Sequence, residues 1–185
     1  SDSQWIKAYA LSMGAGSKVY DSFNNIGSPS SWNVDECRGS FCPNFFRHTI
    51  LDFWDHLSVD EVKLVIYKNK TAVVNMVFNG RNTNLRNWFS REKLKSSPWS
   101  DLPAAGVNLF AMNRFHQRRN FYISSLHNGC EADKGWLYVL EIAHCEFEKR
   151  IPLPVIIYSG DNSRIRWNNN FEKADSMAIF IRLEE

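Results

Sequence analysis

The sequence predicts an all-β protein, an antiparallel β-sandwich of the jelly-roll type with about nine to ten strands and one or two short helices. Apolar residues recur at every second position in several segments, which is the period of a half-buried strand. Glycine and proline separate these segments, and the chain has no long amphipathic helix pattern. No repeat, linker or low-complexity tract divides the sequence, so 1–185 is expected to be a single domain, with a barrel as the second choice of fold.

The first half of the chain contains a hairpin signal. Apolar residues alternate over 62–66 and again over 72–78, with the polar segment Lys68–Lys70 between the two runs. Asn79-Gly80, a favoured turn dipeptide, ends the second run. The other strands expected in this half are 5–13 and 45–54. Residues Asn87–Leu94 are expected to form a short helix.

The second half consists of short apolar runs bounded by turn residues, each of which predicts a strand. These runs are 107–112, 120–126, 136–142, 153–158 and 176–183. The last run is the clearest, because Met177, Ile179 and Ile181 fall on one face of a strand.

Composition excludes several classes of protein. Hydrophobic residues make up 44% and charged residues 23%, close to the globular average, which excludes disordered, collagenous and coiled-coil proteins. No apolar run approaches the roughly 18 residues of a membrane-spanning helix. The net charge of +2 is too small for nucleic-acid binding driven by overall charge, so no nucleic-acid partner is expected.

The unusual feature is an aromatic content of 14%, with 7 tryptophans. Three tryptophans lie within strand-like patterns and are expected in the core: Trp5, Trp54 and Trp136. The other four lie beside turns and are expected at the surface or rim: Trp32, Trp88, Trp99 and Trp167. Rim tryptophans can bind sugars or line a pocket for an aromatic or pigment molecule.

The four cysteines bear on the cellular compartment. Their spacing favours two local disulfides, Cys37–Cys42 and Cys130–Cys145, out of three connectivities. Four buried reduced thiols are the alternative, and a zinc site is disfavoured by the spacing. Asn69-Lys70-Thr71 is a glycosylation sequon at the expected hairpin tip, and the chain starts at Ser1 without a hydrophobic leader, as a processed protein does. The predicted location is therefore extracellular, after secretion.

Motifs spread along nearly the whole chain carry a resemblance to one group of proteins. They are Trp5, Tyr9 and Val19-Tyr20, Val62–Tyr67, Phe78-Asn79-Gly80, Asn87–Ser90, Ser97-Pro98-Trp99, Gly129-Cys130, Asp133–Leu137, Cys145, Pro154 with Ile157-Tyr158-Ser159, and Ala174-Asp175 with Ile179-Phe180. Together they resemble a secreted domain at the C-terminal end of coral skeletal organic-matrix proteins and of related cnidarian and mollusc proteins. The resemblance implies a matrix or surface module and supports the Cys130–Cys145 pairing. It implies no catalytic residues.

No enzyme is predicted, because the sequence has no nucleophile elbow, zinc-protease motif, phosphate loop or dinucleotide fingerprint. The five histidines are scattered. Glu146 and Glu148 fall on one face of an expected strand, but paired acids work as acid and base only at a defined separation.

The polar segment 160–170 is the first candidate binding site. It combines amides, an acid, arginines and a tryptophan, which is the mixture that sugars require. Trp167 would stack on a pyranose, while Asp161, Asn162 and Asn168 would bond its hydroxyls. The alternatives are an ordinary Asn-rich turn with its indole folded onto the sandwich, or a Ca²⁺ site formed by the same oxygens without EF-hand spacing.

The segment Arg114–Phe121 is the densest basic cluster, and the alternative is a solvated hairpin tip. Its Arg118 and Arg119, together with Arg166, are expected to bind acidic groups of a glycan. This composite site requires that the loops 112–121 and 160–170 share one face of the sandwich.

The predicted function is a secreted, non-enzymatic recognition module that binds extracellular, lectin-type glycan ligands, including acidic ones. A structural matrix or adhesion protein that self-associates, as a homo-oligomer would, is one alternative. The other is a carrier of a small hydrophobic or pigment ligand.

Overall fold

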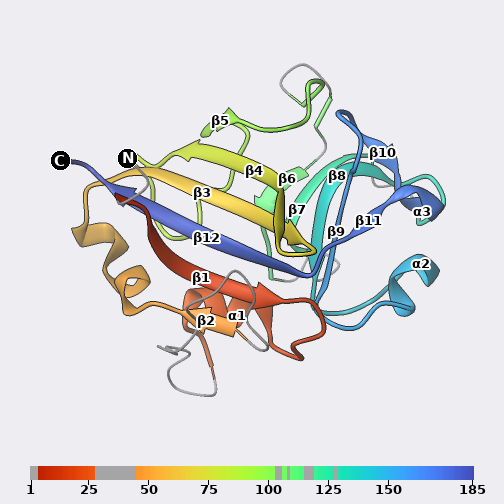
Figure 1. Cartoon of the computed structure of the whole chain (residues 1–185), viewed down its shortest axis with the longest axis horizontal. Helices are drawn as coiled ribbons and strands as arrows, with labels where there is room; N and C mark the ends of the chain where they lie inside the picture. Colours follow the sequence, from red (N-terminus) through yellow and green to blue (C-terminus); the bar gives the residue numbers. More distant parts are fainter. Residues whose placement is uncertain (1–3, 28–44, 103–105, 108, 115–118, 127–128) are drawn as a thin grey trace.

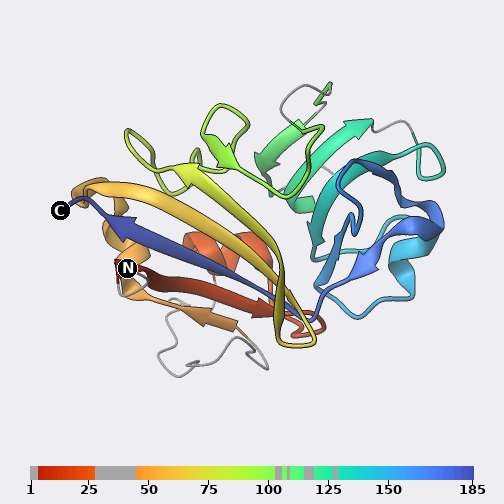
Figure 2. The same cartoon turned by 45° about the horizontal axis from the view of Figure 1, so that its top comes forward.

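The computed structural model describes residues 4–27, 45–102, 106–107, 109–114, 119–126 and 129–185. Two antiparallel sheets of six strands each share one core, so the predicted all-β sandwich is confirmed (Figures 1 and 2). The first sheet contains β1 (Ile6–Ser12), β2 (Phe45–Arg47), β3 (Val59–Lys68), β4 (Thr71–Asn79), β5 (Leu94–Ser96) and β12 (Ser176–Leu183). The second contains β6 (Leu109–Met112), β7 (Arg119–Leu126), β8 (Lys134–Leu140), β9 (Val155–Tyr158), β10 (Ile165–Arg166) and β11 (Glu172–Lys173).

Strand order places the long strands in the middle of each sheet. The first sheet has the order β2-β1-β12-β3-β4-β5. The second has the order β11-β9-β8-β7-β6, and β10 also pairs with β8. The helical segments are α1 (Val19–Asn24), η2 (Thr49–His56), α2 (Glu146–Lys149) and α3 (Trp167–Asn170).

The predicted hairpin is formed by β3 and β4. Lys68 pairs with Thr71, which leaves Asn69 and Lys70 as a two-residue turn. Both turn residues have positive φ, at 51° and 63°, the conformation that matches the twist of the flanking strands. The sequon residue Asn69 is exposed at this tip, where its side chain is accessible. Its glycosylation stays a prediction.

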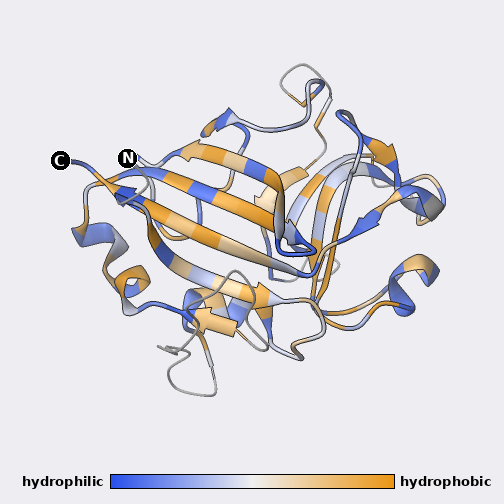
Figure 3. Ribbon diagram, in the orientation of Figure 1, coloured by the Kyte–Doolittle hydropathy of each residue, from blue (hydrophilic) through white to orange (hydrophobic). Residues whose placement is uncertain are grey.

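Alternating side chains place one face of each sheet in the shared core (Figure 3). In β3, Val62, Leu64 and Ile66 are completely buried between the sheets. From the second sheet, Phe121 and Ile123 of β7 pack into the same core. The apolar residues at every second position, from which the strands were predicted, are therefore the residues that face the core.

The tryptophan predictions are partly wrong. Trp54 and Trp136 lie in the core as predicted. Three expected at the rim are at most 1% exposed: Trp88, Trp99 and Trp167. Trp5, expected in the core, is half-buried outside it, and Trp32 lies outside the described residues. The cause is that loops fold back over the sheets, so a position beside a turn does not make an indole exposed.

Two expected elements have a different structure. Only Phe45–Arg47 of the expected strand 45–54 is extended, because His48 Nδ1 accepts a hydrogen bond from the Ile50 N–H at 2.9 Å and begins the 3₁₀ helix η2. The helix expected at 87–94 is absent, and that segment forms turns that lead into β5. The Asn84 side chain accepts hydrogen bonds from the Arg86 and Asn87 N–H groups at 2.9 Å each, which stabilises turns instead of a helix.

The outer face of the second sheet is also covered. We call its buried residues the outer cluster: Tyr122, Tyr138, Leu140, Ile151, Val155, Ile157, Ile165 and Trp167. Phe147 of α2 and Phe171, which follows α3, pack against this cluster. The segments that carry α2 and α3 therefore form a third layer over β8 and β9, at the far end of the second sheet in Figure 1.

Gly135 of β8 lies where a side chain has no room. A Cβ there would lie 2.5 Å from the Ile123 carbonyl oxygen and 3.1 Å from Trp167 Nε1. We expect Gly135→Ala to lower the free energy of unfolding by about 1–3 kcal/mol, because β7 or the indole must move. Thermal unfolding tests this. Gly106→Ala is the matched control, since its Cβ would meet no atom of the described residues within 4 Å. Equal changes in Tm for both variants would contradict the prediction.

Candidate functional site

The segment 159–164 leaves the second sheet as a loop between two strands that share a neighbour. Tyr158 of β9 pairs with Leu137 of β8, and Ile165 of β10 pairs with Gly135 of the same strand. β9 therefore ends beside Leu137 of β8, and β10 begins beside Gly135, two residues away on the same strand. Polar residues in this excursion are held at a fixed point of a rigid sheet.

Hydrogen bonds to the segment after β5 fix the main chain of this loop. The Asn162 carbonyl oxygen accepts from the Ser100 N–H at 2.7 Å, and the Ser159 carbonyl oxygen accepts from Trp99 Nε1 at 3.1 Å. The Arg164 N–H donates to a carboxylate oxygen of Asp101 at 3.0 Å. The loop backbone is therefore ordered before any ligand binds.

A cleft of about 550 Å³ opens beside this loop. We call it the β9–β10 cleft, and its lining residues are Lys68, Val73, Pro98, Trp99, Tyr158, Ser159, Gly160, Asp161, Asn162 and Glu172. Asp161 and Asn162, both predicted ligand residues, are exposed at this cleft. Among the described residues neither side chain has a hydrogen-bond partner, so both are available to a ligand.

Charged and polar groups from three strands complete the cleft. Lys68 of β3 forms an ion pair with Glu172 of β11, and this contact raises the pKa of the lysine. Burial raises the pKa of Tyr158, whose ring belongs to the core, so its hydroxyl keeps its proton at neutral pH. The sequence did not predict these three residues, because Lys68 comes from the first sheet and meets Tyr158 and Glu172 only where the two sheets come together.

The structure does not support stacking by Trp167. This indole is completely buried in the outer cluster, with its ring stacked on Tyr138 at a centroid distance of 4.1 Å. Trp167 covers the outer face of the second sheet with its large apolar ring, and this packing role accounts for its burial. The predicted sugar-stacking role of Trp167 is corrected accordingly.

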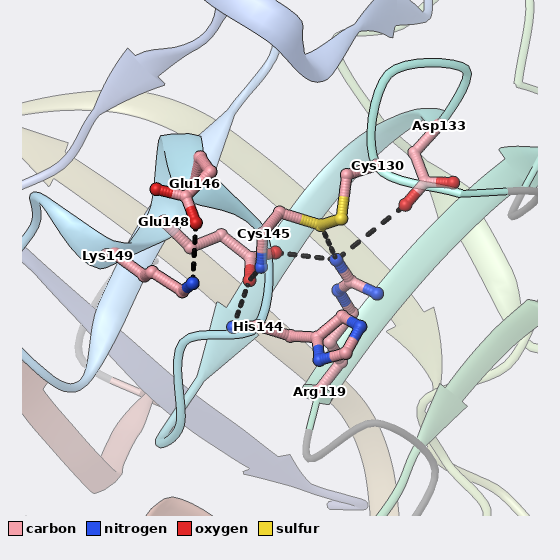
Figure 4. The surroundings of a disulfide bond; sticks show 8 residues. All are labelled: Arg119, Cys130, Asp133, His144, Cys145, Glu146, Glu148 and Lys149. Carbon is pink, nitrogen blue, oxygen red and sulfur yellow. Dashed lines mark hydrogen bonds and ion pairs between the residues drawn. A yellow bond between two sulfur atoms is a disulfide. The ribbon is translucent and has the colours of Figure 1, made fainter.

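Arg119 is likewise a structural residue (Figure 4). Its Nη2 donates to Glu148 Oε1 at 2.5 Å and lies 3.8 Å from an oxygen of Asp133 and 3.6 Å from the Cys145 sulfur. Burial disfavours the charged guanidinium, but Glu148, Tyr138 and Tyr122 together favour it, and the net result is a raised pKa of Arg119. At 1% exposure Arg119 cannot reach a glycan, which corrects the second prediction.

Glu148 connects this ion pair to the predicted disulfide Cys130–Cys145, which is confirmed. Its Oε2 accepts hydrogen bonds from the His144 and Cys145 N–H groups at 2.8 Å each. Glu148 therefore lies in α2 and not on the expected strand with Glu146. The Cys37–Cys42 pair lies outside the described residues.

The remaining predicted residues do not join the cleft. Arg166 and Asn168 are exposed but are not among its lining residues. Arg118 lies outside the described residues. Arg119 pairs with Leu140 at one end of β8, whereas Ile165 pairs with Gly135 at the other end. The side chains of Arg119 and Trp167 nevertheless both lie against the Tyr138 ring, at 4.6 and 4.1 Å, and both are buried there. These two residues therefore do not form an exposed composite site.

Neither a metal site nor a membrane-spanning helix is found among the described residues. In that part of the chain no group of three or more His, Cys, Asp or Glu side chains is placed to hold a metal ion. The structure therefore assigns no ligands to the Ca²⁺ that the sequence allowed. No helix among the described residues is long and apolar enough to cross a membrane.

Comparisons with protein-family models, curated proteins and solved structures gave no match. The resemblance to the coral skeletal-matrix domain stays a prediction from the sequence motifs.

Proposed function

We propose that the chain is a secreted, non-enzymatic recognition module and that the β9–β10 cleft binds an extracellular glycan. The observation that carries this proposal is the pair Asp161 and Asn162, two exposed side chains on an ordered backbone that bond to no other side chain in the described part of the protein. A carboxylate accepts hydrogen bonds from sugar hydroxyls, and an amide both donates and accepts. Two adjacent side chains of these types recognise neighbouring hydroxyls.

The fixed backbone supports binding because little conformational freedom is lost when a ligand docks. Lys68 and Glu172 add charged groups to the lining of the cleft, and these groups bond further hydroxyls or an acidic substituent. Val73, which is 37% exposed, and Pro98 offer an apolar surface to the ring carbons of a sugar. The cleft therefore combines the polar and apolar contacts of a small-ligand site.

Affinity per site is expected to be low. The aromatic rings at the cleft are almost completely buried, with Trp99 at 1% and Tyr158 at 4% exposure, so neither stacks on a pyranose. A Kd near the millimolar range, equivalent to about −4 kcal/mol, is typical of such contacts. Repeated epitopes on one glycan raise the apparent affinity by multivalency.

A glycan array on the protein, with calcium or chelator and at low and high salt, identifies the ligand. We then expect Asp161→Ala/Asn162→Ala to weaken the best ligand at least ten-fold, because each charged or amide hydrogen bond contributes about 1–3 kcal/mol. Titration calorimetry measures this loss. Arg166→Ala/Asn168→Ala is the matched control, since it removes two exposed polar side chains outside the cleft. A blank array, or equal loss in the control, would refute the cleft assignment.

A second candidate function, the carrier of a small ligand, is favoured by a separate cleft of about 470 Å³ beside α1. Ile142 and Leu153 are exposed there, at 38% and 39%, next to the ion pair of Arg114 with Asp21 at 3.0 Å. Apolar surface beside charges suits an amphipathic molecule. A co-purifying molecule, detected by native mass spectrometry or visible absorption, would support this candidate.

A further inference from the structure

Three neighbouring strands of the first sheet align two lysines and a phenylalanine on its outer face. Lys7 of β1 pairs with Phe180 of β12, and Phe180 pairs with Lys63 of β3. The adjacent Ile181 and Val62 point into the core, so this row faces away from it. Figure 1 shows the three strands side by side. Two strand spacings, about 10 Å, separate the two lysine backbones.

Aromatic rings surround Lys63 on this face. Its Nζ lies 4.4 Å from the ring centroid of Trp5 and 5.1 Å from that of Phe180. The guanidinium of Arg182 lies 5.3 Å from the same Trp5 ring. Contacts between ammonium groups and ring faces hold the cation in place without neutralising it. The half-buried Trp5 thus belongs to a surface of cations and aromatic rings.

The charges on this surface are incompletely balanced. Arg182 forms ion pairs with Asp60 and Glu61, and Lys95 also pairs with Glu61 at 2.5 Å. Lys63 has no carboxylate partner among the described residues. Partial burial lowers the pKa of Lys7, so its ammonium group is incompletely solvated. A polyanion that lies along the row would meet the ammonium group of Lys63 and the partly buried ammonium group of Lys7.

We propose that this outer face, defined by Trp5, Lys7, Lys63, Phe180 and Arg182, binds a sulfated polysaccharide. A chain with repeated sulfate groups spans the two lysines, and its sugar rings contact the aromatic side chains between them. Because the three strands are hydrogen-bonded neighbours, they hold this row in a fixed geometry. The face shares no residue with the β9–β10 cleft, so it is a site of its own.

A membrane surface is less favoured as the ligand. Membrane-binding faces combine cations with protruding apolar side chains that enter the lipid. Trp5 and Phe180 are only partly exposed and are held against the sheet by Lys63. The surface can therefore contact a polysaccharide that lies along it, but these two side chains do not protrude far enough to enter a lipid layer.

Chromatography on immobilised heparin tests the proposal. We expect Lys7→Gln/Lys63→Gln to elute at clearly lower salt than the wild type and to bind heparin about ten-fold more weakly in titration. Lys70→Gln/Lys173→Gln is the matched control, because it removes the same charge from two exposed lysines elsewhere. Binding should weaken with added salt and disappear for the desulfated polysaccharide. Circular dichroism and Tm verify that all variants fold.

Three outcomes would overturn the proposal. An equal loss of heparin affinity in the control variant would show that the effect comes from the net charge of the protein and not from this face. Undiminished binding of desulfated heparin would remove the role of sulfate. Tighter binding to phosphatidylserine vesicles than to heparin would make the face a lipid surface. Asp161→Ala/Asn162→Ala is expected to keep full heparin affinity, so failure of the cleft proposal is distinguished from failure of this one.

Discussion

Replacement of Arg119 by methionine is expected to lower the free energy of unfolding by about 3–5 kcal/mol, a large share of the 5–15 kcal/mol typical of a domain. Methionine retains most of the apolar stem but removes the guanidinium. Glu148, whose side chain is 1% exposed, then keeps a buried carboxylate without its counter-charge, and so does the completely buried Asp133. Urea unfolding measures the loss as a lower midpoint.

A double variant separates the ion pair from general packing. In Arg119→Met/Glu148→Gln one of these two carboxylates is replaced by a neutral amide, and we expect part of the lost stability to return. The glutamine oxygen still accepts from one of the two N–H groups at the start of α2. An unchanged midpoint in the single variant, or a double variant less stable than the single one, would show that the pair does not stabilise the fold.

Trp88→Ala is the second large effect that we expect, again about 3–5 kcal/mol, because it leaves a cavity among aromatic rings. Trp88 is completely buried, with ring centroids of Phe78 at 5.2 Å, Phe89 at 5.6 Å and Trp54 at 6.3 Å. Trp88→Phe should be much milder. It keeps a ring and deletes an indole N–H that has no acceptor among the described residues.

The half-buried Trp5 provides the control for this prediction. Trp5→Ala removes the same side chain from the outer face of the first sheet, where water replaces it, so the loss should be clearly smaller than for Trp88→Ala. Thermal and urea unfolding give both values. Equal losses at the two positions would contradict the assignment of Trp88 to the centre of the core.

The fold could be predicted because strand period and turn chemistry are local properties. The β3–β4 hairpin follows from alternating apolar residues and from Asn69 at a turn. The errors occur where distant segments decide the structure. Trp167 and Arg119 are buried because the segments carrying α2 and α3 cover the second sheet, and sequence position alone does not reveal that layer.

Only part of the candidate site could be predicted from the sequence. Asp161 and Asn162 were identified from a polar, loop-like composition, and the structure places both at one cleft. The ion pair in the cleft lining was not predictable, because Lys68 and Glu172 are 104 residues apart and meet only through the arrangement of β3 and β11. The same limit explains the sheet face around Lys63, since its aromatic neighbours depend on strand register.

The lengths of the outermost strands have a consequence for assembly. β2 and β5 have three residues each, β6 has four and β11 has two, and these strands border the two sheets in the described part of the chain. Unpaired N–H and C=O groups on a long border strand recruit strands from other molecules and start fibres. Such short borders offer little template for this polymerisation. If the protein acts in a matrix, its copies are therefore expected to be linked through the ligand they share and not through a continuous intermolecular sheet.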